Sequence, residues 1–249
     1  MLKINGLSAG YKNNHVLNDI SLSADSGEIT TVIGKNGSGK STLLRAILGA
    51  LPKIEGEISF DGEDLRLLSP IELSRRVSYL AQDKNIPDIT VSRLVLSGRF
   101  PHLSYPRRYR KKDIAIAESA MKKMGIYGFR DIKLSALSGG MRQKAYIAMA
   151  LCQQTDVILM DEPTTYLDIT QQFLLADTVR DLANDNKAVI LVLHDLLFAL
   201  RISDRIVLID NGGIGFVGSP CEFVSSGIPE AVYGVHIRSE KNEYYYERI

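Results

Sequence analysis

The sequence Gly-Lys-Asn-Gly-Ser-Gly-Lys-Ser, at residues 34–41, decides the fold. It follows the β-branched run ITTVI at 29–33, which predicts a strand, and it leads into KSTLLRAILG at 40–49, which predicts a helix closed by Gly49. A GxxxxGK[ST] pattern between a strand and a helix is typical of a phosphate-binding loop. Its glycines let the backbone wrap around an anion, and the helix N-terminus adds partial positive charge. The sequence therefore predicts a loop that binds the phosphates of a nucleotide.

Side chains in this loop have separate roles in the prediction. Lys40 supplies a point charge for the β- and γ-phosphates, and the Ser41 hydroxyl is a ligand for Mg²⁺. The alternative is a glycine-rich turn that binds nothing, but the full match to the pattern in its proper context weighs against it. The predicted nucleotide-binding residues are Gly34, Asn36, Gly37, Ser38, Gly39, Lys40, Ser41 and Thr42.

The composition places this loop in an ordinary globular protein. The chain has 249 residues, of which 45% are hydrophobic and 24% charged, and this excludes collagen-like, coiled-coil and wholly disordered chains. A net charge of +1 gives no chain-wide field for nucleic acid or a membrane surface. Cys152 and Cys221 lack CxxC spacing, which argues against a disulfide framework or a structural zinc site.

No targeting or membrane-spanning segment is predicted. The N-terminus lacks a charged region followed by an apolar one, so we expect no secretory signal. A spanning helix needs about 20 consecutive apolar residues, and AVILVL at 188–193 is far shorter. The chain is therefore expected to act at a membrane only through a partner.

Strand and helix patterns alternate over the last part of the chain, which predicts a parallel sheet with crossover helices. The elements predicted there are a helix at 139–154, a strand at 156–161, a helix at 170–184, a strand at 187–193, a helix at 195–202, a strand at 205–210 and a hairpin at 211–213. Before them, strands are predicted within 1–34, at 57–61 and at 76–81, and a mostly helical insertion at 92–136 with a helix at 113–124. The tail at 240–249 is not assigned.

Two adjacent acids follow the apolar run VILM at 157–160. At the carboxyl end of a buried strand, both side chains can reach a phosphate site at the edge of the sheet. We expect Asp161 to hold Mg²⁺, directly or through water, and Glu162 to orient the water that attacks the γ-phosphate. A plain polar turn is the alternative, and the phosphate-binding loop in the same chain makes it the weaker one.

The stretch LSGGMRQ at 137–143 opens a predicted helix and is a second candidate anion site, because it joins a hydroxyl to glycine amides at a helix N-terminus. Two γ-phosphate sites in one chain suggest that two chains share each nucleotide. With this stretch the sequence resembles the ATP-binding-cassette (ABC) ATPases over roughly residues 3–225, with six motifs in the family's order.

The resemblance assigns roles to further residues. Lys40 and Ser41 match the family's Walker A loop, and Asp161 and Glu162 its Walker B pair. The other matches are Tyr11 for the aromatic that stacks on adenine, Gln82 for the Q-loop glutamine and Mg²⁺ ligand, Ser138, Gly139 and Gly140 for the signature, Asp168 for the D-loop and His194 for the switch histidine. Met141 departs from the family's usual Gln or Glu; we expect it to be tolerated, because Ser138 and the glycine amides carry the phosphate contacts.

Taken singly, three of these residues have ordinary alternatives. Tyr11 alone is more often a packed surface aromatic, His194 a satisfied histidine at a strand end, and Gln82 one of many glutamines that end strands. Only their places in the family pattern favour adenine stacking, γ-phosphate sensing and metal binding.

The family implies an α/β fold: a P-loop NTPase core with a mixed sheet, an N-terminal antiparallel β subdomain and an inserted helical subdomain. A single ABC ATPase domain would cover 1–249, with the nucleotide-binding core at 1–82 and 137–249 and the helical subdomain at 83–136. The family further implies a homodimer around two Mg-ATP, a polytopic membrane permease, indirectly a substrate-binding protein, no nucleic acid, and a place on the cytoplasmic face of the plasma membrane.

The stretch RFPHLSYPRRYRKK at 99–112 carries six Lys and Arg and no acid. It is interpreted as a solvated loop held open by Pro101 and Pro106, or as a surface facing the permease and anionic head groups. A nucleic-acid patch is the weakest of the three hypotheses, because aromatic residues are thinly interleaved and the rest of the chain is neutral.

Two stretches resemble the ATPases of iron-chelate importers, a group shared by siderophore, haem and cobalamin systems. They are SGRFPH at 97–102 and DEPTTYLD at 161–168, and together they favour an iron–siderophore complex as cargo. A non-transport ABC ATPase of iron–sulfur cluster assembly remains an alternative. A DNA-repair ABC ATPase is disfavoured, because its long coiled coils would not fit the 54 residues at 83–136.

Overall fold

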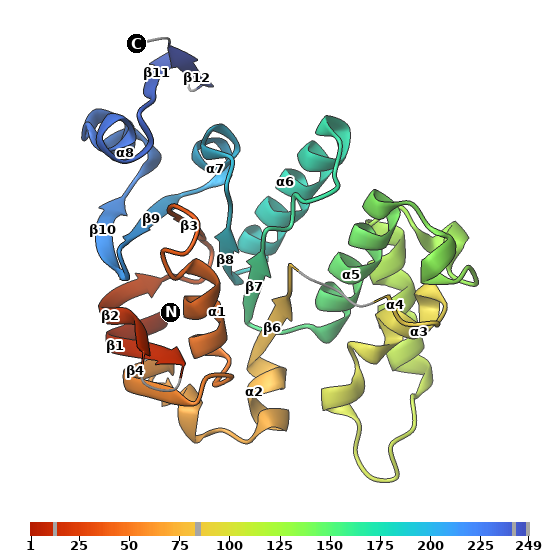
Figure 1. The fold of residues 1–249 in the computed structure, drawn as a ribbon. Helices are drawn as coiled ribbons and strands as arrows, with labels where there is room; N and C mark the ends of the chain where they lie inside the picture. Colours follow the sequence, from red (N-terminus) through yellow and green to blue (C-terminus); the bar gives the residue numbers. More distant parts are fainter. Residues whose placement is uncertain (12–13, 83–85, 241–242, 248–249) are drawn as a thin grey trace. The chain divides into compact units, whose positions relative to one another are not determined.

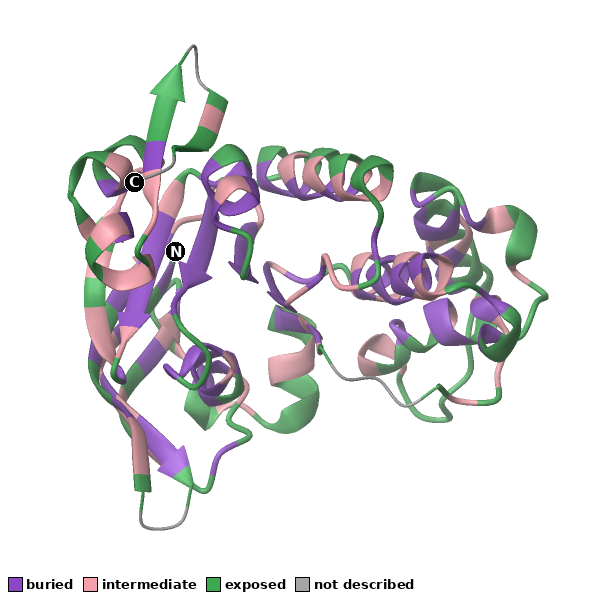
Figure 2. Cartoon of the chain, turned by 45° about the horizontal axis from the view of Figure 1, so that its top comes forward, coloured by how far each residue is buried: buried purple, intermediate pink, exposed green. Residues whose placement is uncertain are grey.

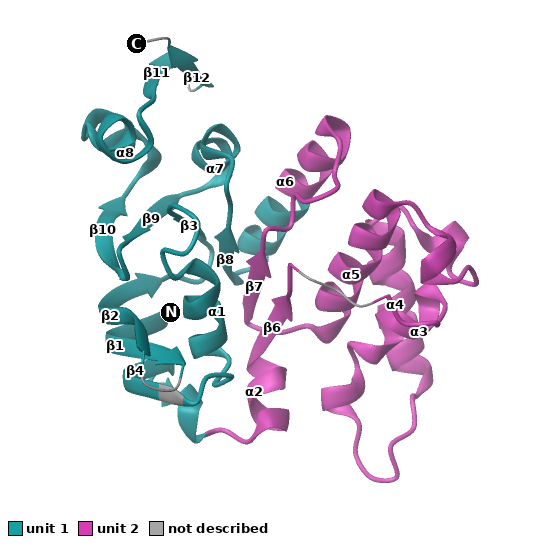
Figure 3. Ribbon diagram, viewed as in Figure 1, with its two compact units in different colours: residues 1–67, 178–249 teal, residues 68–177 magenta. Residues whose placement is uncertain are grey.

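The computed structural model describes residues 1–11, 14–82, 86–240 and 243–247. Three parts of the expectations lie outside these described residues: Lys12 beside Tyr11, residues 83–85 at the start of the expected helical subdomain, and residues 241–242 and 248–249 of the tail. The chain divides into two compact units, Met1–Leu67 with Thr178–Ile249, and Leu68–Asp177 (Figure 3).

The first unit contains an antiparallel sheet in the order β2-β1-β4-β5. Its strands are β1 (Leu2–Tyr11), β2 (Asn14–Ala24), β4 (Lys53–Phe60) and β5 (Glu63–Asp64). Buried apolar residues recur along β1 and β2, as expected of strands with one face in a core. The expected N-terminal antiparallel β subdomain is confirmed.

A second sheet of this unit carries the phosphate-binding loop. Strand β3 (Ile29–Ile33) pairs in parallel with β8 (Ala188–Val192) and with β9 (Arg205–Asp210), and β10 (Gly213–Gly218) is antiparallel to β9. Both β3 and β8 are buried along their whole length, and Figure 2 draws buried residues in purple. Parallel strands covered on both faces need continuous apolar runs, which ITTVI and AVILV supply. The expected mixed sheet is confirmed.

Helices and a tail hairpin complete this unit (Figure 1). Helix α1 (Lys40–Ile47) follows the loop after β3, and α7 (Leu196–Ile202) joins β8 to β9. The remaining elements are a 3₁₀ turn η1 (Leu65–Leu67), the part of α6 (Ile169–Asn184) from Thr178 onward, α8 (Pro220–Ser225), a π-helical turn η5 (Pro229–Tyr233), β11 (His236–Glu240) and β12 (Glu243–Glu247). The described residues of the unassigned tail are Glu240, which ends β11, and β12, and these two strands pair antiparallel.

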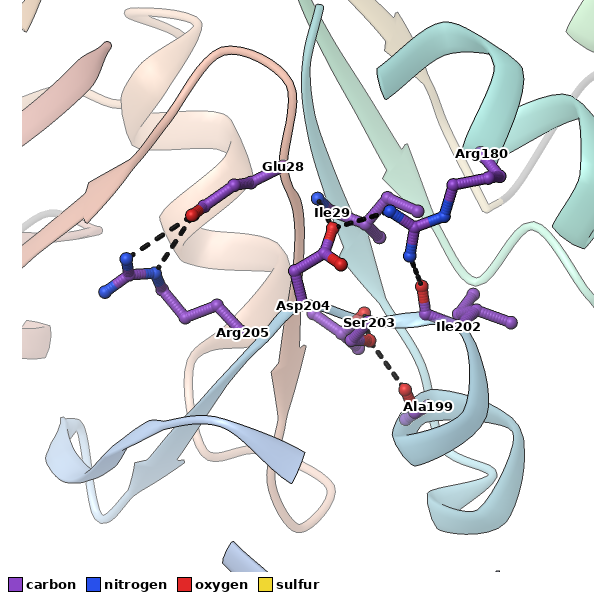
Figure 4. Close-up of polar contacts among 9 residues, drawn as sticks. Glu28, Ile29, Arg180, Ala199, Ile202, Ser203, Asp204 and Arg205 are labelled. Carbon is purple, nitrogen blue, oxygen red and sulfur yellow. Dashed lines mark hydrogen bonds and ion pairs between the residues drawn. The ribbon is translucent and has the colours of Figure 1, made fainter. Parts of the chain in front are cut away.

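Polar contacts fasten the turn before β9 to the start of β3 (Figure 4). Asp204 accepts hydrogen bonds from the backbone N–H of Ile29 at 2.8 Å and from Nη1 of Arg180 at 2.9 Å. Arg205, at the start of β9, lies 3.4 Å from a carboxylate oxygen of Glu28. These contacts hold β3 at the end opposite to the phosphate-binding loop, so the loop leaves a fixed strand.

The second unit joins a parallel strand pair to a cluster of helices. Strands β6 (Val77–Leu80) and β7 (Val157–Asp161) pair in register, Leu80 beside Met160. Helices α3 (Val91–Ser97), α4 (Lys111–Lys123) and α5 (Gly139–Gln153) pack on one another. Its other elements are α2 (Pro70–Arg76), the 3₁₀ turns η2 (Phe100–His102), η3 (Tyr127–Phe129) and η4 (Leu134–Ala136), and the first half of α6 (Ile169–Asn184).

The described part of the expected helical subdomain lies wholly inside this larger second unit. The predicted helices at 113–124, 139–154 and 170–184 are confirmed as α4, α5 and α6. Helices α2 and α8 were not predicted; both are short, and each is started by a capping box, Ser69 with Glu72 and Ser219 with Glu222. Among the described residues, no helix is long and apolar enough to cross a membrane.

Candidate functional site

The phosphate-binding loop adopts a backbone that only glycine accepts easily. Gly34, Gly37 and Gly39 have φ angles of 151°, 80° and 112°. A Cβ on Gly34 would collide with the backbone oxygen of Ile209, and one on Gly39 would lie 2.6 Å from Leu17. Apart from Gly37 and its two chain neighbours, none of the described residues has an atom within 4 Å of a Cβ position on Gly37, so they leave the loop open on that side. The three glycines are therefore required by the loop's own conformation.

Polar atoms inside the loop fit a phosphate group. Lys40 is only 6% exposed, and its ammonium donates to the backbone oxygens of Gly34 at 2.8 Å and Lys35 at 3.0 Å. The hydroxyl oxygen of Ser38 is buried and has no hydrogen-bond partner among the described residues. A buried cation, a buried unpaired hydroxyl and open space beside Gly37 suit an oxyanion. Ser41 and Thr42 lie in the first turn of α1 directly after Lys40, whereas Asn36 is exposed.

Two other predicted residues lie in the same unit. Because β8 runs parallel to β3, His194 lies beyond the same end of this sheet as the phosphate-binding loop, and it is exposed. The next residue, Asp195, caps α7 by accepting from the N–H of Phe198 at 3.1 Å. Tyr11 ends β1, is 39% exposed, and its hydroxyl accepts from Arg45 of α1 at 2.9 Å. This bond ties Tyr11 to the helix that begins at the loop.

The second unit brings the predicted carboxylates and glutamine together. Asp161 ends β7 and is 3% exposed, and Glu162 turns away with a φ of 49°. Nε2 of Gln82, which follows β6, donates to a carboxylate oxygen of Glu162 at 2.5 Å. Tyr79 was missed by the sequence reasoning; its hydroxyl donates to Asp161 at 3.2 Å. Only the pairing of β6 with β7 brings Tyr79 near, and no motif indicated it.

The signature turn begins α5 in the predicted way. Ser138 is the N-cap, and its hydroxyl accepts from the N–H of Met141 at 3.3 Å. Asp168, in the D-loop, accepts from the N–H of Gln171 at 2.8 Å. A pocket of about 180 Å³ is lined by Gln82, Ile86, Gly139, Arg142, Gln143, Tyr146 and Tyr166. Gln82 and the signature therefore border one pocket of this unit.

The interpretation of 99–112 as a solvated loop needs correction at both ends. Lys111 and Lys112 begin helix α4, and Arg99 is buried. Its guanidinium is buried, lies 3.2 Å from a carboxylate oxygen of Asp113, and donates to the backbone oxygen of Cys152 at 3.0 Å. The remaining Arg and Lys of the stretch, from Arg107 to Lys112, are exposed. The sequence alone could not separate Arg99 from them, because its partners come from α4 and α5.

Cys152 is a buried apolar side chain, as expected. It is fully buried, and this burial raises the pKa of its thiol to about 12. The thiol is therefore neutral near pH 7 and inert as a nucleophile. Among the described residues, no group of three or more His, Cys, Asp and Glu side chains could hold a metal ion by itself.

Comparisons with known proteins identify the family. A family model described as ABC transporter matches residues 17–165. The ferric enterobactin transport ATP-binding protein FepC of Escherichia coli (strain K12) is 39% identical over 232 residues, covering 92% of this chain and 85% of that protein. The petrobactin import ATP-binding protein FpuD of Bacillus anthracis is 36% identical over 234 residues, with 93% and 86% covered.

Solved structures agree on the fold. A dimeric bacterial ABC transporter cassette has a TM-score of 0.77 and 27% identity, covering 88% of this chain and 99% of that one. A nucleotide-free ATP-binding cassette of an ABC transporter has a TM-score of 0.82 at 24% identity, covering 91% and 95%. The chain therefore belongs to the ABC transporter family, as an ATPase subunit with the family's α/β P-loop fold.

Proposed function

We propose that this chain is the ATPase subunit that energises an importer of an iron–siderophore complex. The observation that carries the proposal is the 39% identity over 92% of the chain to a ferric enterobactin transport ATP-binding protein. Relatives for petrobactin and achromobactin, at 36% and 34% identity, point to the same class of cargo. A further relative, at 35% identity, is named as a probable siderophore transport system ATP-binding protein.

Nucleotide binding is assigned to the phosphate-binding loop. Lys40 neutralises the β- and γ-phosphates, the Ser38 hydroxyl gains a phosphate partner, and the glycine backbone offers N–H groups without a side chain in the way. Asn36, Ser41 and Thr42 complete the contacts, and Tyr11 supplies a ring for adenine stacking. The buried unpaired hydroxyl of Ser38 supports this assignment.

Hydrolysis is assigned to residues at the strand ends. Mg²⁺ would neutralise phosphate charge, and Ser41, Asp161 and Gln82 are the residues that would hold it. Glu162 orients the attacking water, and its 2.5 Å bond from Gln82 fixes the direction of its carboxylate. His194 donates to the γ-phosphate. Positioning and charge neutralisation supply most of the rate enhancement.

A second copy of the chain completes each site in this proposal. Ser138, Gly139, Gly140 and Asp168 lie in segments that would face the nucleotide of the opposite copy, so that two chains enclose two ATP molecules. The likeness to a dimeric cassette, with a TM-score of 0.77, supports a homodimer. Closing of the dimer on ATP and reopening after hydrolysis would drive the permease.

Transport requires partners in the membrane. We assign 83–136 as the helical subdomain that docks on a polytopic permease at the cytoplasmic face of the plasma membrane, with 1–82 and 137–249 as the nucleotide-binding core. The exposed basic residues from Arg107 to Lys112 suit an acidic permease surface or anionic head groups. A substrate-binding protein would deliver the cargo on the other side.

Cobalamin is the second candidate cargo. The cobalamin import ATP-binding protein BtuD of Halobacterium salinarum (strain ATCC 29341 / DSM 671 / R1) is 34% identical over 95% of this chain, although the match spans only 59% of that protein. Uptake measurements separate the two: cells that lack this chain should lose uptake of radioiron-loaded siderophore and keep uptake of labelled cobalamin. The reverse pattern would replace the siderophore by cobalamin.

The partner is tested by co-purification. The tagged chain is isolated from gently solubilised membranes, and the proteins that accompany it are identified by mass spectrometry. A polytopic permease supports the importer subunit. A soluble scaffold protein without any membrane protein would instead support the non-transport ATPase of iron–sulfur cluster assembly.

The catalytic assignment is tested by Glu162→Gln. The amide retains the size of the side chain but cannot polarise water as a carboxylate does, so turnover should fall about 10³-fold while ATP binding persists. Phosphate release at saturating ATP measures the first effect, and dimer formation on sizing columns with ATP measures the second. Full turnover in this variant would remove Glu162 from the catalytic role.

A further inference from the structure

The first turn of α5, which carries the signature, is packed against the segment that follows Glu162. A Cβ on Gly139 would lie 3.1 Å from the Cβ of Tyr166, and a Cβ on Gly140 would collide with the side-chain amide oxygen of Gln171. Nε2 of Gln143, on the next turn, donates to the backbone oxygen of Pro163 at 2.8 Å. Both segments belong to the second unit, so these contacts form within one chain.

Gln171 occupies an unusual place in this contact. Its backbone N–H is held by Asp168 at 2.8 Å, which fixes the start of α6. Its side-chain amide oxygen is buried and has no hydrogen-bond partner among the described residues. A buried carbonyl oxygen without a donor costs free energy. Packing, rather than a hydrogen bond to this oxygen, therefore keeps the amide in place. The absence of a side chain at Gly140 leaves the space that the amide occupies.

We propose that Gln171 is a positioning residue for the signature. Its amide fills the space above Gly140 and locks the first turn of α5 to the D-loop, which continues the chain from Glu162. Gln171 therefore sets how the first turn of α5 lies against the segment that carries Asp168. This inference rests on the proposed function, because the signature matters only when it meets a nucleotide on a second copy.

The proposal predicts a defect confined to dimer closure. Gln171→Ala removes the amide from above Gly140 and frees the signature turn, but it leaves the phosphate-binding loop untouched. In a Glu162→Gln background, the ATP concentration that gives half-maximal dimer formation should rise about tenfold. A change of this size is typical when a contact between two side chains is lost. ATP affinity at protein concentrations too low for dimers, and the melting temperature, should match the parent.

Thr170→Ala is the matched control, because Thr170 is exposed in the same turn of α6. In the same Glu162→Gln background, the Thr170→Ala chain should form dimers at the same ATP concentration as the parent chain. If Gln171→Ala closes as readily as Thr170→Ala, the positioning role is overturned while the proposed function stands. If the Glu162→Gln parent itself fails to dimerise with ATP, the proposed function fails and the inference fails with it.

A double substitution tests the contact itself. Because Gly140 also belongs to the signature, Gly140→Ala should weaken dimer formation by itself, and the test is the coupling between the two positions. Gly140→Ala already displaces the Gln171 amide, so adding Gln171→Ala should cost less in the Gly140→Ala chain than in the parent chain. Independent losses that multiply in the double variant would show that the two residues act separately, and this would overturn the proposal.

Discussion

The phosphate-binding loop and the signature turn are both glycine-rich starts of helices, yet they need their glycines for different reasons. In the loop, Gly34, Gly37 and Gly39 have positive φ angles. In the signature, Gly139 and Gly140 are ordinary helical residues, and the space for their side chains is taken by Tyr166 and Gln171. One set of glycines permits a backbone conformation, and the other permits a close approach.

The buried and bonded polar side chains of the two regions also differ in how they are placed. Lys40 is bound by backbone oxygens of its own loop, so the local sequence suffices to place its ammonium. Gln82, by contrast, meets Glu162 across 80 residues, and Arg99 meets the oxygen of Cys152 across 53. The Lys40 ammonium is therefore placed by neighbours in sequence, and these polar groups of the second unit are placed by neighbours in space.

Arg99→Ala should have the largest effect and sharpens this contrast. Removing it leaves the Asp113 carboxylate, with 3% of its side chain exposed, without its buried partner, which should cost about 3–5 kcal/mol of unfolding free energy. Arg107→Ala is the control, since Arg107 stacks on Phe100 at the surface and should cost less than about 1 kcal/mol. Urea denaturation measures both, and equal losses would contradict the assignment of Arg99 to the interior.

Lys40→Ala should abolish useful nucleotide binding. Losing a charge-assisted contact of about 3 kcal/mol lowers the affinity for ATP roughly 100-fold. Lys35→Ala removes an exposed lysine from the same loop and should change the affinity far less. Calorimetric titration compares them, and unchanged affinity in Lys40→Ala would count against the phosphate-binding assignment.

Gly39→Ala against Gly140→Ala tests the comparison itself. An alanine at 39 has a strained φ of 112° and meets Leu17, so unfolding free energy should fall by about 1–3 kcal/mol. An alanine at 140 gains about 1 kcal/mol of helix propensity, offset by displacing a flexible side chain, so stability should hardly change. If thermal melts show that the two variants lose equal stability, the two glycines are not required for different reasons, and the comparison is wrong.

The smallest expected effect is a pH dependence of the buried ion pair. Burial raises the pKa of Asp113, but the N–H of Arg110 and the Arg99 guanidinium outweigh it and hold that pKa below its ordinary value. A lowered pKa means that the stabilisation is present above about pH 4 and is lost as the pH falls further. The stability difference between the native chain and Asp113→Asn should therefore shrink toward pH 3 in urea titrations; a constant difference would contradict the assignment.

Much of the fold followed from short-range pattern. The β-branched run before Gly34, the apolar run before Asp161 and the Asn211–Gly213 turn identified β3, β7 and the β9–β10 hairpin, because each signal lies within the element itself. Helices α2 and α8 and the tail hairpin escaped, because they are short and carry weak apolar periodicity. Helices α2 and α8 did carry local signals, since each begins with a capping box and a proline in its first turn.

The sequence by itself determined the phosphate-binding loop, since glycine conformations and a helix start are encoded within eight neighbouring residues. Family resemblance added the roles of single residues such as Gln82 and His194, which no local chemistry reveals. Only the tertiary structure decided that Arg99 is buried, that Tyr79 supports Asp161 and that Gln171 covers Gly140. Such contacts join residues far apart in the chain, and side-chain packing between elements, which no sequence pattern encodes, selects them.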